Sequence, residues 1–105
     1  MPDIVIACYR PKPGQDAALR ALLREHVPYL RQEGLATARE PILGQAKDGT
    51  YVEMFEWATG AIARAHEHPG VRAMWLRYDE ACEHVALKDL AEAQGLFAGL
   101  ASVEL

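Results

Sequence analysis

The sequence has few of the features that mark membrane, secreted or nucleic-acid-binding proteins. It holds only two cysteines in 105 residues, too few for a disulfide framework or a four-cysteine zinc site. Eleven basic residues stand against fifteen acidic ones, and the net charge of −4 disfavours a nucleic-acid partner. No apolar run approaches the roughly 18 residues of a membrane span, and the first ten residues lack the basic head of a signal peptide. We therefore expect a cytoplasmic protein whose partners are neither membranes nor nucleic acids.

The composition that remains is that of an ordinary folded domain. Half of the residues are apolar and a quarter are charged. A chain of 105 residues builds one hydrophobic core without disulfides or zinc, so we expect a single domain over residues 1–105. Cys8 and Cys82 are interpreted as reduced and buried, because cytosolic thiols stay reduced and free cysteine is usually buried.

Strand and helix patterns alternate along the chain. Residues 4–9 form an apolar, β-branched run that ends in a Pro and Gly cluster, which predicts a strand buried on both faces. Residues 15–32 carry apolar side chains at spacings of three and four, which predicts a helix with His26 on its inward stripe. Pro28 predicts a kink or an irregular last turn in this helix. Residues 36–58 predict a hairpin that turns at the Asp48-Gly49 dipeptide.

The second half of the chain adds helices and a further strand. A short helix is expected over residues 59–66, a longer one from Pro69 to about Cys82, and a last strand over residues 83–87. Strand, helix, strand, strand, helix, strand is the order of the ferredoxin-like unit. We therefore predict an α+β fold with a four-stranded antiparallel sheet and its helices on one face.

The same patterns predict a partner for this sheet. Helices on one side cover only one face of a four-stranded sheet, and the other face is normally polar. The strands at residues 4–9 and 51–57 look apolar on both sides, so a second copy stacked on the open face would bury it. Closed two-fold symmetry is the commonest arrangement of this kind, and we expect a homodimer. The apolar C-terminal tail, residues 89–105, is expected to pack on the domain or on that partner.

Two motifs carry a resemblance to a known family. The segment 51–57, YVEMFEW, leads into a short helix, and His66-Glu67-His68-Pro69 precedes Trp75. In these features residues 3 to about 88 resemble the dimeric α/β-barrel superfamily, and more narrowly the antibiotic biosynthesis monooxygenase-like proteins. The resemblance implies a cofactor-independent monooxygenase that oxidises a phenolic or quinol substrate in a cleft between sheet and helices. In that chemistry the substrate anion itself reacts with oxygen, so the protein mainly orients and desolvates it.

The family's functional residues match this sequence in part. Trp57 stands where the monooxygenases have a Trp at the end of the third strand, and Glu53 stands where they have an Asn that orients the substrate. Their helical Arg has no single match here. The haem-degrading branch of the superfamily has an Asn, a Trp and a His at the places of Ala7, His66 and Leu76. Because all three differ, haem degradation is disfavoured, and the resemblance to cofactor-independent monooxygenases implies no other cofactor.

The expected cleft collects aromatic and titratable side chains. His66 and His26 are the candidates for a catalytic base or a substrate anchor, His66 through the resemblance and His26 through its inward position. The candidate ligand-binding residues are Trp57, Trp75, Tyr78, Tyr9 and Glu53. Each has a structural alternative: the aromatics as plain core, His26 as a buried neutral histidine, and Glu53 as the partner of an arginine across the dimer. His66 and His68 are two positions apart, which points them to different sides of a helix, so no metal site is expected.

Two other functions fit the same residues. The chain could be a non-catalytic dimer that binds a small ligand or a protein, with the cleft filled by its own side chains. It could also be a cofactor-free isomerase or lyase in which one histidine or glutamate shuttles a proton. An open pocket distinguishes a ligand-binding cleft from a packed core, and turnover without oxygen uptake distinguishes the isomerase or lyase.

Overall fold

A computed structural model describes all 105 residues of the chain. The elements are, in chain order, β1 (Asp3–Pro11), α1 (Asp16–Gln32), β2 (Ile42–Gln45), β3 (Tyr51–Trp57), α2 (Ala61–Glu67), α3 (Pro69–Ala81), β4 (Cys82–Val85), the 3₁₀ turns η1 (Leu87–Asp89) and η2 (Ala91–Gln94), and β5 (Ala101–Ser102). The predicted α+β class is confirmed. None of the helices is long and apolar enough to cross a bilayer.

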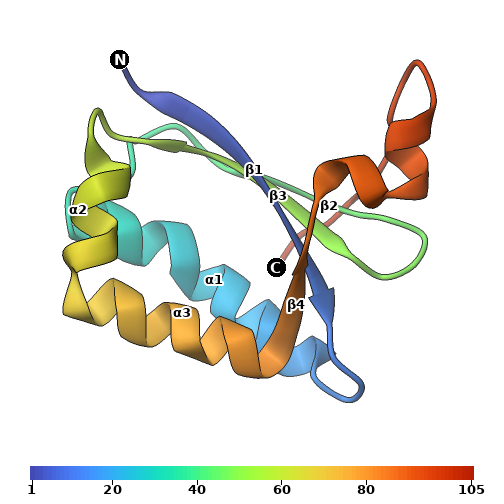
Figure 1. Ribbon diagram of the computed structural model, residues 1–105, viewed down its shortest axis with the longest axis horizontal. Helices are drawn as coiled ribbons and strands as arrows, with labels where there is room; N and C mark the ends of the chain where they lie inside the picture. Colours follow the sequence, from blue (N-terminus) through green and yellow to red (C-terminus); the bar gives the residue numbers. More distant parts are fainter.

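The strands form one antiparallel sheet in the order β4-β1-β3-β2-β5 (Figure 1). The four expected strands are present, but the predicted count is wrong because β5 adds a fifth strand beside β2. The backbone of this segment approaches β2 so closely that a Cβ on Gly44 would lie 2.9 Å from the Cβ of Leu100, which favours glycine there. A strand of two residues has no measurable periodicity, so the sequence pattern does not indicate it.

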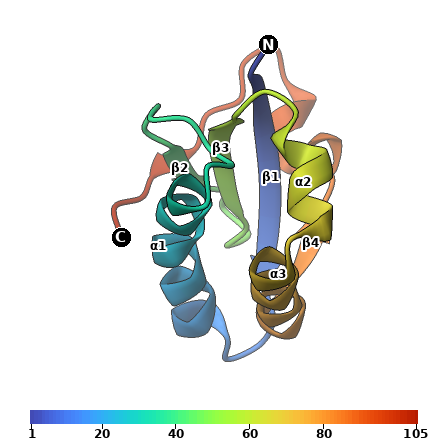
Figure 2. The same ribbon diagram turned by 90° about the vertical axis from the view of Figure 1, so that its left-hand side faces the viewer.

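The helices cover one face of the sheet. α1 and α3 run side by side on that face, and α2 lies near one end of the pair (Figure 2). α1 buries the predicted stripe of Leu19, Leu22, Leu23, His26, Val27 and Leu30. Pro28 falls inside α1, and the helix continues beyond it to Gln32. α3 begins at Pro69, and the His68 side chain caps it by accepting a hydrogen bond of 3.1 Å from the backbone N–H of Val71.

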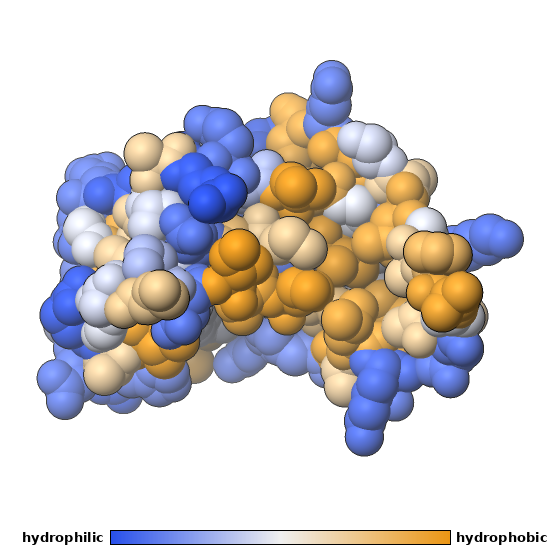
Figure 3. All heavy atoms as spheres, turned by 90° about the horizontal axis from the view of Figure 1, so that it is seen from above, coloured by the Kyte–Doolittle hydropathy of each residue, from blue (hydrophilic) through white to orange (hydrophobic).

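The opposite face of the sheet is only partly covered. The segment that follows β4 packs Leu90 onto Cys8 and Val52, which bury a small second core. Beyond this cover Ile4 is 57% exposed and Ile42 is 67% exposed. Ile6 and Met54 are exposed beside them on the same face of the sheet. We call this set of four residues, Ile4, Ile6, Ile42 and Met54, the open apolar face. Figure 3 shows hydrophobic side chains gathered on this side of the molecule.

Candidate active site

A cavity of about 140 Å³ lies between the helical face of the sheet and the helices. Its walls come from β1, β3, β4, α1 and α3, and the lining residues are Val5, Ala7, Tyr9, His26, Phe55, Trp57, Trp75 and His84. Ala7 lies between Val5 and Tyr9 on the β1 wall, and its small side chain leaves room where a larger one would fill the space. A dry cavity of about 150 Å³ is known to hold one benzene ring. The cavity here is open to solvent on one side rather than enclosed, and its volume is close to that of a single ring.

A buried hydrogen-bonded group stands at the wall of this cavity. His26 Nδ1 lies 2.8 Å from Glu53 Oε1, and Tyr9 donates its hydroxyl hydrogen to the same oxygen at 3.0 Å. His26 and Glu53 are each only 3% exposed. An ionised carboxylate only accepts hydrogen bonds, so ionised Glu53 places the hydrogen of the His26 ring on Nδ1. In the neutral form of this ring the second nitrogen, Nε2, carries a lone pair and can take a proton from a ligand.

The local topology explains why these three side chains meet. His26 reaches the sheet from the inward stripe of α1. Glu53 lies on β3 directly opposite Ala7 on β1, and Tyr9 is two residues farther along the same face of β1. The phenol of Tyr9 therefore lies diagonal to Glu53, within reach of a long side chain. This arrangement holds His26 on two sides, because Phe55 and Tyr78 pack edge-on against its ring at 5.1 and 5.4 Å.

The two tyrosines at this site remain protonated. Burial raises the pKa of Tyr9 well above its usual range, and the charge of Glu53 raises it further. Burial also raises the pKa of Tyr78, again helped by Glu53. The Tyr78 hydroxyl is buried and has no hydrogen-bond partner. Tyr78 does not line the cavity, so this unpaired hydroxyl belongs to the side chains that pack against His26.

The structure brings most of the sequence-predicted site residues together. Trp57, Trp75, Tyr9 and His26 line the cavity, and Glu53 and Tyr78 contact His26 from behind. His66 lies outside the cavity: its ring packs edge-on against Trp75 at 5.1 Å, and its Nδ1 pairs with the backbone carbonyl of Ile62 at 2.9 Å.

Sequence reasoning named four of the eight lining residues and missed the other four, Val5, Ala7, Phe55 and His84. Phe55 shares a strand face with Trp57, so the alternation of β3 could have indicated it. His84 follows Cys82 by two positions on the same face of β4, but its place beside Tyr9 depends on the pairing of β4 with β1. Glu53 pairs with His26 within the chain, and the outward-facing Glu56 pairs with Arg39 at 3.2 Å.

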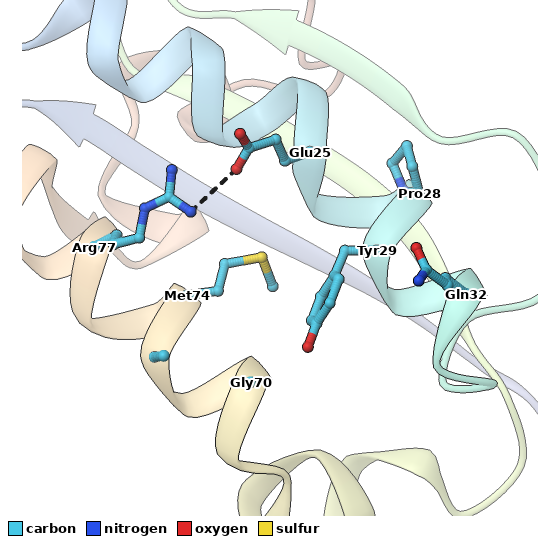
Figure 4. A pocket seen from close by; sticks show the side chains of 8 residues that line it. Glu25, Pro28, Tyr29, Gln32, Gly70, Met74 and Arg77 are labelled. Carbon is cyan, nitrogen blue, oxygen red and sulfur yellow. Dashed lines mark ion pairs between the residues drawn. The ribbon is translucent and has the colours of Figure 1, made fainter.

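A larger pocket of about 460 Å³ lies between α1 and α3 (Figure 4). Glu25 and Arg77 form an ion pair of 3.2 Å across it, and both side chains are more than half exposed. The Tyr29 hydroxyl lies so close to Gly70 that a side chain at this point of α3 would displace it. This pocket holds no titratable group that is shielded from water, so the smaller cavity is the candidate active site.

The chemistry available at the cavity is proton transfer and aromatic packing. No group of three or more His, Cys, Asp or Glu side chains is arranged to hold a metal ion. No protein-family model, curated protein or solved structure matches the chain. The resemblance to the antibiotic biosynthesis monooxygenase-like proteins therefore stays a prediction that rests on the motifs given above.

Proposed function

We propose that the protein is a small-molecule enzyme similar to the cofactor-independent monooxygenases, with a phenolic or quinol substrate bound in the 140 Å³ cavity. The observation that carries this proposal is the buried His26–Glu53 pair at the wall of a cavity lined by aromatic side chains. A phenol must lose its proton to become electron-rich enough for oxygen, and a histidine oriented by a carboxylate is a suitable base. His26, rather than His66, takes this role in the proposal.

The proposed reaction balances without a cofactor. A 1,4-hydroquinone and O₂ would give hydroxy-1,4-benzoquinone and water, so the ring itself supplies all the electrons that reduce oxygen. One oxygen atom enters the ring, and the other leaves as water. His26 Nε2 accepts the hydroxyl proton of the substrate and returns it as water forms, while Glu53 stabilises the intervening imidazolium. The walls formed by Trp57 and Trp75 orient the ring and keep water away.

We also propose a ferredoxin-like fold, a homodimer and a cytoplasmic location. The order β4-β1-β3-β2 with the helices on one face supports a ferredoxin-like fold extended by β5. The open apolar face supports a homodimer in which a second copy stacks on the sheet, because isolated chains rarely leave a contiguous apolar patch in water. Cys8 and Cys82 are both free and buried, which supports a reducing, cytoplasmic location. Light scattering at micromolar concentration tests the dimer, and a stable monomer would refute it.

Oxygen consumption with a panel of single-ring hydroquinones tests the proposed function. We expect His26→Gln to lower the rate by about 10²- to 10⁴-fold, the usual contribution of a positioned base. Glu53→Gln is expected to lower it less, since the amide oxygen still accepts from His26. His66→Ala separates the two sequence-predicted bases, because a loss of rate there instead of at His26 would reject His26. Glu83→Gln, on the outward face of β4, is the matched control. No oxygen uptake with any hydroquinone would refute the monooxygenase.

The same base also supports a second candidate, the cofactor-free isomerase or lyase. The His26–Glu53 pair would move a proton between two positions of a substrate without any oxygen chemistry. Turnover that proceeds equally well under nitrogen and is lost in His26→Gln would favour this candidate. Ligand binding with no turnover of either kind would favour the non-catalytic binding protein.

A further inference from the structure

The cavity has a closed end and an open end, and a histidine stands at each. Tyr9, His26, Phe55 and Trp57 are buried, whereas the His84 side chain is 57% exposed. Phe55 and Trp57 lie on β3, on one side of β1, and His26 is hydrogen-bonded to Glu53 of that same strand. His84 lies on the other side, because β1 runs between β3 and β4. Neighbouring strands are about 4.8 Å apart, so β3 and β4 are separated by roughly 10 Å across β1. A ligand over Ala7 would therefore have His26 at one end and His84 at the other.

The pairing of β4 explains why the cavity opens on this side. β4 pairs only with Cys8–Pro11 of β1. From Asp3 to Ala7, β1 has β3 as its only neighbour. His84 is thus on the part of β4 that borders the uncovered stretch of β1, where a ligand can enter. It packs edge-on against Tyr9 at 5.4 Å and lies 4.0 Å from Asp79, so one exposed carboxylate is its only charged neighbour on α3.

We propose that this cavity selects single-ring ligands with polar groups at opposite ends, a hydroxyl that reaches His26 and a hydrogen-bond acceptor that His84 binds. This inference deepens the proposed function by assigning the substrate class and a specificity residue, His84. A ring with polar groups on adjacent carbons cannot reach both histidines, and a two-ring molecule would extend out of the space of about 140 Å³, past His84. Ala7 sets the size limit, because its methyl group forms the floor beneath the ring.

Ligand binding is measurable without turnover, which separates this inference from the proposed function. The chain has two tryptophans, and both line the cavity, so intrinsic fluorescence reports directly on its occupancy. The probes are 4-hydroxybenzoate, its isomer 2-hydroxybenzoate, and 6-hydroxy-2-naphthoate, which carries the same two groups on two rings. We expect 4-hydroxybenzoate to bind at least about tenfold more tightly than either of the others, the value of one hydrogen bond to a charged group.

Substitutions at the open end of the cavity and at its floor complete the test. His84→Ala is expected to remove the preference for the 4-isomer, and Glu83→Gln, the neighbouring outward-facing residue, to keep it. Ala7→Leu is expected to abolish binding of all three probes by filling the floor. Ala7→Val is expected to weaken binding, and it keeps the test valid if the leucine variant does not fold. Equal affinity for the two isomers, or an unchanged preference in His84→Ala, would overturn the inference. Selective binding without oxygen uptake would leave it standing and refute only the monooxygenase.

Discussion

Replacing Glu53 by an apolar residue should cost a large share of the stability of the fold. It accepts hydrogen bonds from His26 at 2.8 Å and from Tyr9 at 3.0 Å, and all three side chains are almost fully buried. Glu53→Leu removes both bonds and leaves two polar hydrogens without an acceptor. Each hydrogen bond to a charged group contributes about 1.5–3 kcal/mol, so we expect the free energy of unfolding to fall by about 3–5 kcal/mol. Domains of this size have about 5–15 kcal/mol in total.

The sharper expectation concerns the double variant. Adding His26→Leu to Glu53→Leu removes one of the two orphaned groups, so the double variant should be more stable than the single one by about 1–3 kcal/mol. Urea denaturation followed by circular dichroism measures both differences, and an unchanged m-value shows that the same surface unfolds. Glu56→Leu, on the opposite face of β3, removes the hydrogen bond from Thr37 Oγ1 at 2.9 Å and the ion pair with exposed Arg39, and should cost only about 1–2 kcal/mol.

Two results would refute this reasoning. If Glu53→Leu costs no more than Glu56→Leu, the His26–Glu53 pair is hydrated in solution and is not the dry dyad described above. If the double variant is less stable than Glu53→Leu alone, His26 is held by packing against Phe55 and Tyr78 rather than by the carboxylate. Either outcome would also weaken the assignment of His26 as a base oriented by Glu53.

Three further predictions concern other parts of the chain. Burial raises the pKa of the Cys82 thiol to about 11, so iodoacetamide at pH 8 should leave it unmodified until urea unfolds the protein. The hydrogen bond of 2.9 Å from the backbone N–H of Thr50 lowers the pKa of Asp48 below its usual 3.8, which stabilises the fold above that pH. Asp48→Ala should therefore lower the melting temperature at pH 7, and the difference should vanish as pH falls through the folded pKa. Gly44→Val should push Leu100 away and speed hydrogen exchange in β5, while the global melting temperature changes little.

Local patterns predicted much of this fold because each helix or strand is indicated by residues close together in the chain. The spacing of apolar side chains placed His26 on the inward stripe of α1, and strict alternation placed Glu53 on the same face of β3 as Trp57. The contact between His26 and Glu53 was not predictable in this way. It depends on which helix packs over β3 and on which residues of the two elements face each other. His26 and Glu53 are 27 positions apart in the chain, so no local pattern links them.

The features that the sequence did not predict depend either on contacts between distant residues or on segments too short to show a pattern. The role given to His66 came from the resemblance, but the turn between α2 and α3 places it on the outer side of Trp75. The cavity exists because Ala7 is small and because β4 ends at Val85. The spacing of apolar residues along the chain indicates neither of these two features. β5 consists of two residues, fewer than a pattern of alternation needs.

The central position of β1 has a consequence for how the chain folds during synthesis. β1 is the first strand to leave the ribosome, yet both of its neighbours in the sheet come much later in the chain. Cys8 pairs with Val52 and with Val85, so its second pairing is complete only when most of the chain has been made. Contacts between such distant residues slow folding. Until then the nascent chain carries an apolar strand with two free edges, which is a template for aggregation.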